Sequence, residues 1–215
     1  MECLNYNISR TELQKKIGKY LDQNGLPKVL PAKEYKELGV NGLLGFYVMT
    51  STYVLPTEEL IDALDTIIGP DSEAIEICCG NGVIGRELCM TLTDSKIQQK
   101  DLVIREQYLR LGNPPISYPE DVVEMEALEA ARHYKPDTVL ACFGTHLWKP
   151  GMNDGFQYGV DYEELWKLVP RIILVGNDKV HGENPLMKRR HKEITRYGFL
   201  SRTQNSTNKI YIWER

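Results

Sequence analysis

Hydrophobic and polar positions along the chain follow two different periods. Short runs with almost no polar residue, at 74–79 (AIEICC), 138–144 (TVLACFG) and 171–177 (RIILVGN), are typical of buried parallel strands. The segments between them carry apolar residues at every third or fourth position, which predicts amphipathic helices. Repeated alternation of strands and helices predicts an α/β fold, in which a mostly parallel sheet is covered by helices on both faces.

Capping residues, glycine and proline mark where these elements begin and end. Thr57 is expected to cap a helix whose apolar stripe runs from Leu60 to Ile68. Asp121 is expected to cap the helix that ends before Pro136. Further helices are predicted over residues 83–90, 100–112, 161–169 and, with a strongly basic composition, 184–197, and short strands are predicted over residues 91–94 and 115–118.

The N-terminal part predicts helices of its own. Residues 9–25 begin with a capping box (S-x-x-E) and place apolar residues on one face, and residues 31–39 predict a second, short helix. Residues 40–56 are apolar and dotted with glycine, without a regular period, so we expect an irregular segment there. We therefore predict an N-terminal helical extension over residues 1–50.

The C-terminal part predicts an antiparallel feature. Residues 198–215 hold two β-rich runs around polar turn residues at 205–207, which is typical of a hairpin. Together with the five strands before it, this hairpin predicts a doubly wound, mostly parallel, seven-stranded sheet with a terminal antiparallel hairpin. We assign this Rossmann-like domain to residues 51–215.

The chain of 215 residues has an ordinary globular composition, with 42% hydrophobic and 26% charged residues, and its length can bury a core without disulfides or metal. Its net charge of −4 gives no overall attraction to nucleic acid or anionic lipid. We expect neither a secretory signal at the N-terminus nor a membrane span. The five cysteines are an odd number and lack the spacing of a metal site, so we expect free thiols in a reducing cytoplasm.

Three glycines follow the first buried run. Gly80, Gly82 and Gly85 form the pattern G-x-G-x-x-G between a predicted strand and a predicted helix, which lets the main chain approach a ligand closely. A tight turn without a ligand is the alternative interpretation. A nicotinamide-binding fold has an uncharged strand before the glycines and an acid about 20 residues beyond them. Here Glu76 lies inside the strand, and Asp94 follows only nine residues after Gly85.

The spacing of Glu76, Gly80 and Gly82 resembles motif I of the class I S-adenosylmethionine-dependent methyltransferases, with Cys78 in place of the first glycine of that motif. The resemblance extends roughly over residues 53–215 and includes the closing hairpin, which is similar to the antiparallel last strand of that family. It implies a Rossmann-like fold, S-adenosylmethionine as the cofactor and methyl transfer as the reaction.

The resemblance also implies a role for each matching position. Gly80, Asn81 and Gly82 would pass beneath the methionine part of the cofactor, and Glu76 would fix this loop and the cofactor amine. The acid that closes the second strand, Asp94, would accept hydrogen bonds from the ribose hydroxyls, with Asp101 as the fallback. Further cofactor contacts are expected at Cys78, Cys142, Asp121 and Val122, of which the last two fall near the adenine.

The end of the fourth strand should place Thr145, His146 and Trp148 beside the reacting methyl group. Methyl transfer from a sulfonium is an in-line displacement, so alignment supplies much of the rate, and a base is needed only when the acceptor must lose a proton. His146 is the candidate base, because imidazole titrates near neutrality, and a structural loop histidine is the alternative. The candidate acceptor site consists of Tyr53, Thr145, Trp148 and His181.

These observations predict an enzyme that transfers a methyl group from S-adenosylmethionine to a small-molecule acceptor. The acidic charge balance and the absence of an added nucleic-acid-binding module favour a small molecule over nucleic acid, and no membrane partner is expected. Three alternatives remain open: a non-catalytic binding or scaffold protein with the same fold, an NAD-dependent oxidoreductase, and a nucleic-acid methyltransferase. The basic stretch 184–197 would supply the contact surface of the last, although a solvated helix face is its simplest explanation.

Overall fold

The computed structural model describes residues 15–153, 155–195, 198–203 and 206–215. The predicted capping box at Ser9 and Glu12 lies outside the described residues, and so does part of the predicted turn at 205–207. Within the described ranges, no helix combines the length and the apolar character that crossing a membrane requires.

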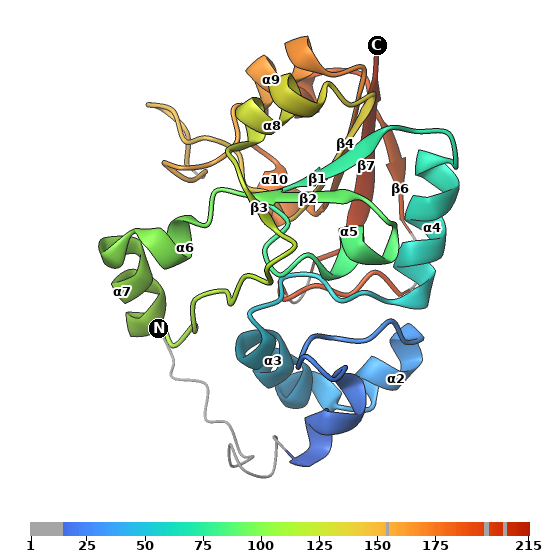
Figure 1. Cartoon of the computed structure of the whole chain (residues 1–215), viewed down its shortest axis with the longest axis vertical. Coiled ribbons are helices and arrows are strands. Elements are labelled where there is room, and N and C mark those ends of the chain that lie inside the picture. Colours follow the sequence, from blue (N-terminus) through green and yellow to red (C-terminus); the bar gives the residue numbers. More distant parts are fainter. Residues whose placement is uncertain (1–14, 154, 196–197, 204–205) are drawn as a thin grey trace.

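A seven-stranded sheet forms the centre of the described chain (Figure 1). Its order is β3-β2-β1-β4-β5-β7-β6, in which the first five strands are parallel and β7 runs antiparallel to both of its neighbours. The strands are β1 (Ala74–Ile77), β2 (Thr91–Asp94), β3 (Val123–Glu124), β4 (Thr138–Cys142), β5 (Arg171–Gly176), β6 (Lys192–Ile194) and β7 (Lys209–Glu214). The predicted α/β fold, with a mostly parallel sheet and an antiparallel edge pair, is confirmed.

Helices cover both faces of this sheet, with α4 and α5 on one side and α8 and α9 on the other (Figure 1). The helical elements are η1 (Gly18–Tyr20), α2 (Ala32–Lys36), α3 (Gly39–Thr50), α4 (Glu58–Ile68), α5 (Val83–Glu87), α6 (Ile97–Lys100), α7 (Leu102–Arg110), α8 (Ala127–Tyr134), α9 (Tyr162–Leu168), α10 (Asp178–His181) and η2 (Pro185–Lys188). The predicted cap of α4 is confirmed, because the Thr57 hydroxyl accepts a hydrogen bond from the Leu60 amide.

Side chains of the central strands alternate between two hydrophobic clusters, as the period of a strand requires. In β4, Val139 and Ala141 pack in the cluster that includes α8 and α9, whereas Leu140 packs in the cluster that includes α4 and α5. All three side chains are completely buried. Burial on both faces explains why the central strands read as unbroken apolar runs in the sequence.

The N-terminal part packs around a third, aromatic cluster. The rings of Tyr20 and Tyr35 are stacked with their centroids 5.6 Å apart, and Phe46 of α3 meets both of them. The prediction of an irregular segment at 40–56 is therefore wrong as far as Thr50. The helix forms because tertiary packing of its apolar side chains outweighs the weak period and the glycines of the sequence.

Two further differences concern the region after α7. Residues 115–118 form no strand, and the third strand is instead β3, whose Val123 pairs with Thr93 of β2. The following helix therefore begins at Ala127, and Asp121 does not cap it. Both residues of β3 are exposed, so no apolar pattern marks them, and their strand conformation follows from pairing with β2.

The described part of the predicted basic helix over 184–197, residues 184–195, does not form that helix. The 3₁₀ helix η2 ends at Lys188, and β6 then pairs with β7 through Lys192–Ile212 and Ile194–Ile210. The antiparallel pair at the edge of the sheet is thus made by β6 and β7, and not by two runs within 198–215. Backbone hydrogen bonds to β7 decide the conformation here. The charged side chains of this stretch do not pack in a core, so no buried face favours a helix.

Candidate functional site

A cleft lies at the carboxyl ends of β1, β2 and β4. It contains about 940 Å³ of space, part of which is open to solvent. The order of the strands reverses between β1 and β4, and ligands of open α/β sheets bind at such a switch point. The cleft is therefore in the place that the glycine pattern predicted.

The turn after β1 has a left-handed backbone at Gly80, where φ is 59°, and at Gly82, where φ is 71°. These two glycines face different surroundings. A Cβ atom on Gly80 would meet only the Ile116 side chain, at 3.4 Å, and Gly80 lines the cleft. A Cβ atom on Gly82 would lie 2.6 Å from Leu92 Cδ1, so this glycine faces the sheet and is not among the residues that line the cleft. The expected cofactor contact at Gly82 is not supported by this placement.

Asn81 lies between these glycines and ties the turn to the end of α3. Its side-chain amide donates to the Thr50 carbonyl oxygen at 3.3 Å and to the Thr52 hydroxyl at 3.0 Å. Asn81 is 5% exposed and lines the cleft. The floor of the cleft is therefore held by the segment that precedes the sheet as well as by the sheet itself.

Glu76 occupies the middle of β1 and lies at the bottom of the cleft, where its exposed fraction is 1%. Its Oε2 atom accepts a hydrogen bond from the Gly85 amide at 2.9 Å, and this contact fixes the start of α5. Burial raises the pKa of Glu76 to about 7; hydrogen bonds from Gly85 and Cys142 lower it, and the neighbouring charge of Asp94 raises it. The predicted role of Glu76 in holding the loop agrees with this geometry.

Asp94 ends β2 directly beside the glycine turn. Its two oxygens accept hydrogen bonds from the Gly80 amide at 3.0 Å and from the Lys96 amide at 2.8 Å. Burial raises the pKa of Asp94, although these two bonds and a hydrogen bond with Tyr118 oppose the effect. The fallback residue, Asp101, instead caps α7 by accepting from the Val103 and Ile104 amides and does not line the cleft.

The charged residues that line the cleft are all acidic. Among the described residues that line it, Glu76 and Asp94 are the carboxylates, and there is no lysine, arginine or histidine. Cys78 and Cys142 also line the cleft, and burial raises the pKa of both thiols, which keeps them neutral. A cleft with two buried carboxyl groups and no lining cation favours a ligand that carries positive charge.

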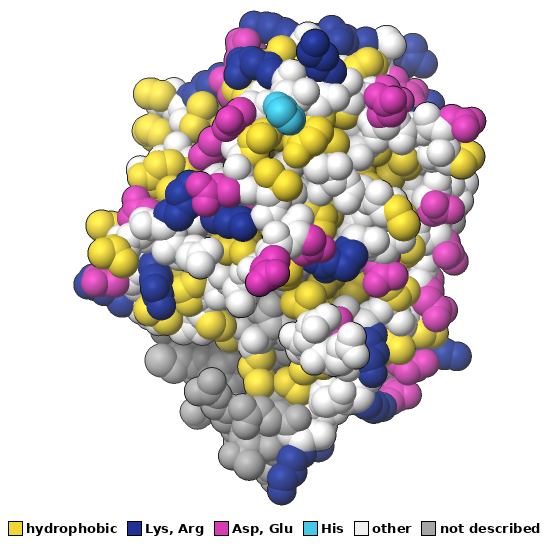
Figure 2. All heavy atoms as spheres, in the orientation of Figure 1, with side chains coloured by type: hydrophobic (Ala, Val, Ile, Leu, Met, Phe, Trp, Pro, Cys, Tyr) yellow, Lys and Arg dark blue, Asp and Glu magenta, His cyan; other side chains and the backbone are white. Residues whose placement is uncertain are grey.

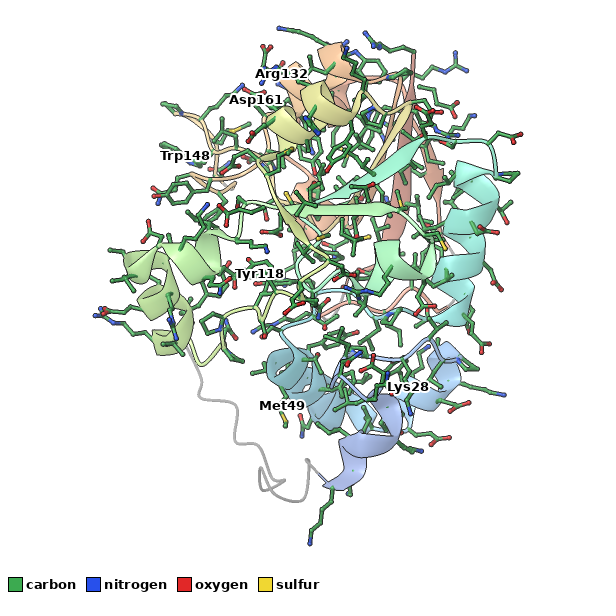
Figure 3. The ribbon with its side chains drawn as sticks, in the orientation of Figure 1. Lys28, Met49, Tyr118, Arg132, Trp148 and Asp161 are labelled. Carbon is green, nitrogen blue, oxygen red and sulfur yellow. The ribbon has the colours of Figure 1, made fainter. Side chains whose placement is uncertain are left out.

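Several residues that the sequence assigned to the site lie elsewhere. His146 and His181 are completely buried and do not line the cleft. The ring of His181 packs edge-on against Phe143, and burial lowers its pKa to about 4, so this histidine is neutral near pH 7. Trp148 lies on an outlying loop, where its indole donates to the Met152 carbonyl oxygen (Figure 3). Of the residues proposed for acceptor contact, Tyr53 and Thr145 do line the cleft.

The two residues expected near an adenine are also outside the cleft lining. Asp121 forms a two-bond ion pair with Arg86, at 2.8 and 2.9 Å, and lines a neighbouring depression. Val122 is buried against Cys79, Leu92 and the partly buried Tyr118. The displacement of this pair follows from the formation of β3, which takes the place of the first turn of the predicted helix.

Aromatic residues form a large part of the cleft wall, and the sequence analysis did not identify most of them. Tyr118 lies between the sheet and α3 (Figure 3). The others were missed because they lie on separate loops and on α7, with no common motif. The signal available in the sequence is that aromatic residues recur in the segments that follow the carboxyl ends of strands. The additional wall residues are Gln98, Tyr108, Ile116, Phe143, Phe156 and Tyr158.

The basic stretch does not belong to this site. Figure 2 shows acidic and basic side chains intermingled over most of the visible face, with basic ones gathered at the end that carries α8 and α9. The Arg189 and Arg215 guanidinium groups both lie over the Trp166 ring of α9, at 5.6 and 5.7 Å from its centroid. No described residue between 184 and 195 lines the cleft.

Comparisons with known proteins give limited information. No protein-family model matches the chain, and a search of curated proteins found no match. One similar solved structure is the Thermoplasma acidophilum protein 1320, with 14% identity, a TM-score of 0.35, and coverage of 86% of this chain and 94% of that one. A second is the bifunctional kinase-methyltransferase WbdD, with 10% identity, a TM-score of 0.39, and coverage of 73% and 37% of the two chains.

A third similar structure is a chain of the Pnkp1/Rnl/Hen1 RNA repair complex, with 8% identity, a TM-score of 0.36, and coverage of 85% and 48% of the two chains. The present chain thus spans less than half of the length of the second and third of these proteins. All three TM-scores are below 0.5, and the function is therefore inferred from the geometry of the chain itself.

Proposed function

We propose that this chain binds S-adenosylmethionine in the cleft and transfers its methyl group to a small-molecule acceptor. One observation carries the proposal: Glu76 and Asp94 are buried carboxyl groups that flank the glycine turn, and no described lysine, arginine or histidine lines the cleft beside them. S-adenosylmethionine carries an ammonium and a sulfonium group. It would therefore bring to these carboxylates the positive charge that the described lining residues do not supply.

The shape of the turn fits this cofactor. Gly80 leaves the main chain bare on the side of the cleft, where only Ile116 approaches. Asp94 is fixed by the Gly80 and Lys96 amides, which leaves lone pairs of its carboxylate for the hydroxyls of a ribose. Glu76 would hold the amine of the cofactor. When bound, S-adenosylmethionine supplies an electrophilic methyl group; the residues of the chain orient it and exclude water.

Two features disfavour a nicotinamide dinucleotide. Its pyrophosphate is anionic, and the cleft would bring it close to Glu76 and Asp94 without a lining cation among the described residues. The dinucleotide-binding sheet has the order 3-2-1-4-5-6, whereas here the antiparallel β7 lies between β5 and β6. This arrangement is similar to the closing hairpin of the methyltransferase family whose motif I the glycine turn resembles.

Calorimetric titration of the purified protein tests the proposal. We expect binding heat with S-adenosylmethionine and with S-adenosylhomocysteine, and none with NADH. Heat with NADH alone would replace the proposal with the oxidoreductase alternative. Binding of the methyl donor without transfer of radiolabelled methyl to a broad panel of small molecules would instead support the binding or scaffold alternative.

A further inference from the structure

Much of the cleft wall is aromatic. Besides the two carboxyl groups, the lining includes Tyr53, Tyr108, Phe143, Phe156 and Tyr158, which come from separate segments of the chain. The Phe156 and Tyr158 rings are centred 5.6 Å apart at an interplanar angle of 68°, which is an edge-to-face pair. Tyr158 is 45% exposed, so part of its ring meets solvent at the mouth.

The backbone holds this aromatic pair in place. The Phe156 amide donates to the His146 carbonyl oxygen at 2.9 Å, and the Val160 amide donates to the Thr145 carbonyl oxygen at 2.9 Å. A Cβ atom on Gly159 would lie 2.2 Å from the His146 carbonyl oxygen, so only glycine allows this close contact. The two rings are therefore presented by a loop that backbone hydrogen bonds join to residues 145 and 146.

The chemistry of the wall restricts the acceptor. An anionic molecule would face Glu76 and Asp94 with no lining cation among the described residues. Burial raises the pKa of Tyr53 and of Tyr118, so these hydroxyls stay protonated and are poor bases. The two carboxyl groups are bound to backbone amides at the inner end of the cleft. With Glu76 and Asp94 engaged by the proposed cofactor, the wall suits a planar, non-anionic acceptor whose nucleophilic atom has no proton to lose.

Resting on the proposed function, we propose that the acceptor is a planar aromatic nitrogen base, which Phe156 and Tyr158 hold and which is methylated at an uncharged ring nitrogen. The nitrogen lone pair forms the new bond to the methyl carbon while the carbon–sulfur bond breaks and its electron pair stays on sulfur. No proton is transferred. The positive charge moves from sulfur to the ring nitrogen, where the aromatic faces attract it.

Three probes of similar size test this inference: isoquinoline, the N-methylisoquinolinium cation and 2-naphthoate. Their binding is measured by calorimetry with and without saturating S-adenosylhomocysteine. We expect the neutral base and the cation to bind and the anion not to bind. Mass spectrometry after incubation of isoquinoline with S-adenosylmethionine should detect N-methylisoquinolinium. Binding of 2-naphthoate as tightly as isoquinoline would overturn the inference.

Matched variants locate the binding. Phe156→Ala and Tyr158→Ala should each weaken isoquinoline binding by about three- to tenfold and leave the affinity for S-adenosylhomocysteine unchanged. Tyr158→Phe keeps the ring and should bind as the parent protein does. Trp148→Ala removes an equally exposed ring, at 46%, from the same loop outside the cleft and should have no effect.

The results separate the two proposals. Absence of S-adenosylhomocysteine binding would refute the proposed function, and the probes would still report on the aromatic wall of the free protein. Cofactor binding together with probe affinities that the Phe156 and Tyr158 variants do not change would refute only the present inference.

Discussion

The Asp94 carboxylate accepts a hydrogen bond from the Gly80 amide at 3.0 Å, and this bond joins the end of β2 to the turn after β1. The same carboxylate lines the cleft. One side chain therefore sets the shape of the turn and presents negative charge beside it. Substitution of Asp94 therefore changes the turn and the charge together, and only substitutions at other positions can separate ligand binding from folding.

The two glycines of the turn should respond differently to the same substitution. Asparagine tolerates a left-handed backbone, so Gly80→Asn should keep the fold and place a side chain in the cleft. We expect it to weaken S-adenosylhomocysteine binding at least about tenfold with a nearly unchanged melting temperature. Gly82→Asn would drive its Cβ atom against Leu92 and should cost about 1–3 kcal/mol of unfolding free energy. Calorimetry and thermal unfolding of both variants measure the contrast, and equal losses of stability would contradict it.

Cofactor affinity should depend on pH through Glu76. The pKa of this carboxyl in the free protein is about 7, and a bound cation favours its ionised form. Below pH 7 binding must therefore release a proton, and affinity for S-adenosylmethionine should fall about tenfold per pH unit. Calorimetric titrations in buffers of different ionisation enthalpy measure the number of protons that binding releases. Glu76→Gln should bind weakly at every pH, without this dependence, and a wild-type affinity that is constant between pH 6 and pH 8 would contradict the assignment.

The same residue should limit the stability of the free protein. Its folded pKa of about 7 lies above the ordinary value of 4.5, so the folded state favours the protonated form. The contribution of Glu76 to the unfolding free energy should therefore be highest below pH 4.5, decrease as the pH rises to 7, and stay low above it. At pH 8, Glu76→Gln should be more stable than the parent by up to about 3 kcal/mol, and at pH 4.5 the difference should largely disappear. Urea unfolding at both pH values provides the measurement.

Substitution of Asp94 and of Asp121 should affect cofactor affinity differently, although the resemblance assigns both residues to the cofactor site. Asp121 pairs with Arg86 at the surface and is not part of the cleft wall, so Asp121→Asn should leave cofactor affinity unchanged. Because this pair is partly exposed, its loss should cost no more than about 1 kcal/mol of stability. Asp94→Asn should instead weaken binding strongly. A comparable loss of affinity in the two variants would restore Asp121 to the cofactor site.

Capping residues and buried strands could be predicted from the sequence because their signals are local. Thr57 caps α4 as expected, Asp161 caps α9 at the start of the predicted helix over 161–169, and the glycine turn follows β1 where the pattern placed it. The strands β3 and β6 could not be predicted, because they are short and polar and become strands only by pairing with β2 and β7.

The same distinction applies to the site. Glu76, Gly80 and Asp94 could be predicted to lie near one another because they belong to predictable strands or to the turn that follows β1. The aromatic wall could not, since Phe156 and Tyr158 reach the cleft through a loop whose course depends on tertiary hydrogen bonds. His146 lies in the expected segment, but its side chain packs into the interior, and the sequence carries no signal for that orientation.

The tether from Asn81 to Thr50 and Thr52 has a practical consequence for dissecting this protein. A recombinant fragment that starts near residue 53 would retain every strand of the sheet and still lose both anchors of the ligand-facing turn. Deletion of the leading helices should therefore yield a folded sheet with a loosened floor. The segment that ends at Thr52 thus supports the glycine turn and also forms part of the cleft wall, through Ser51 and Thr52, so shortening the chain past this point would open the site from below.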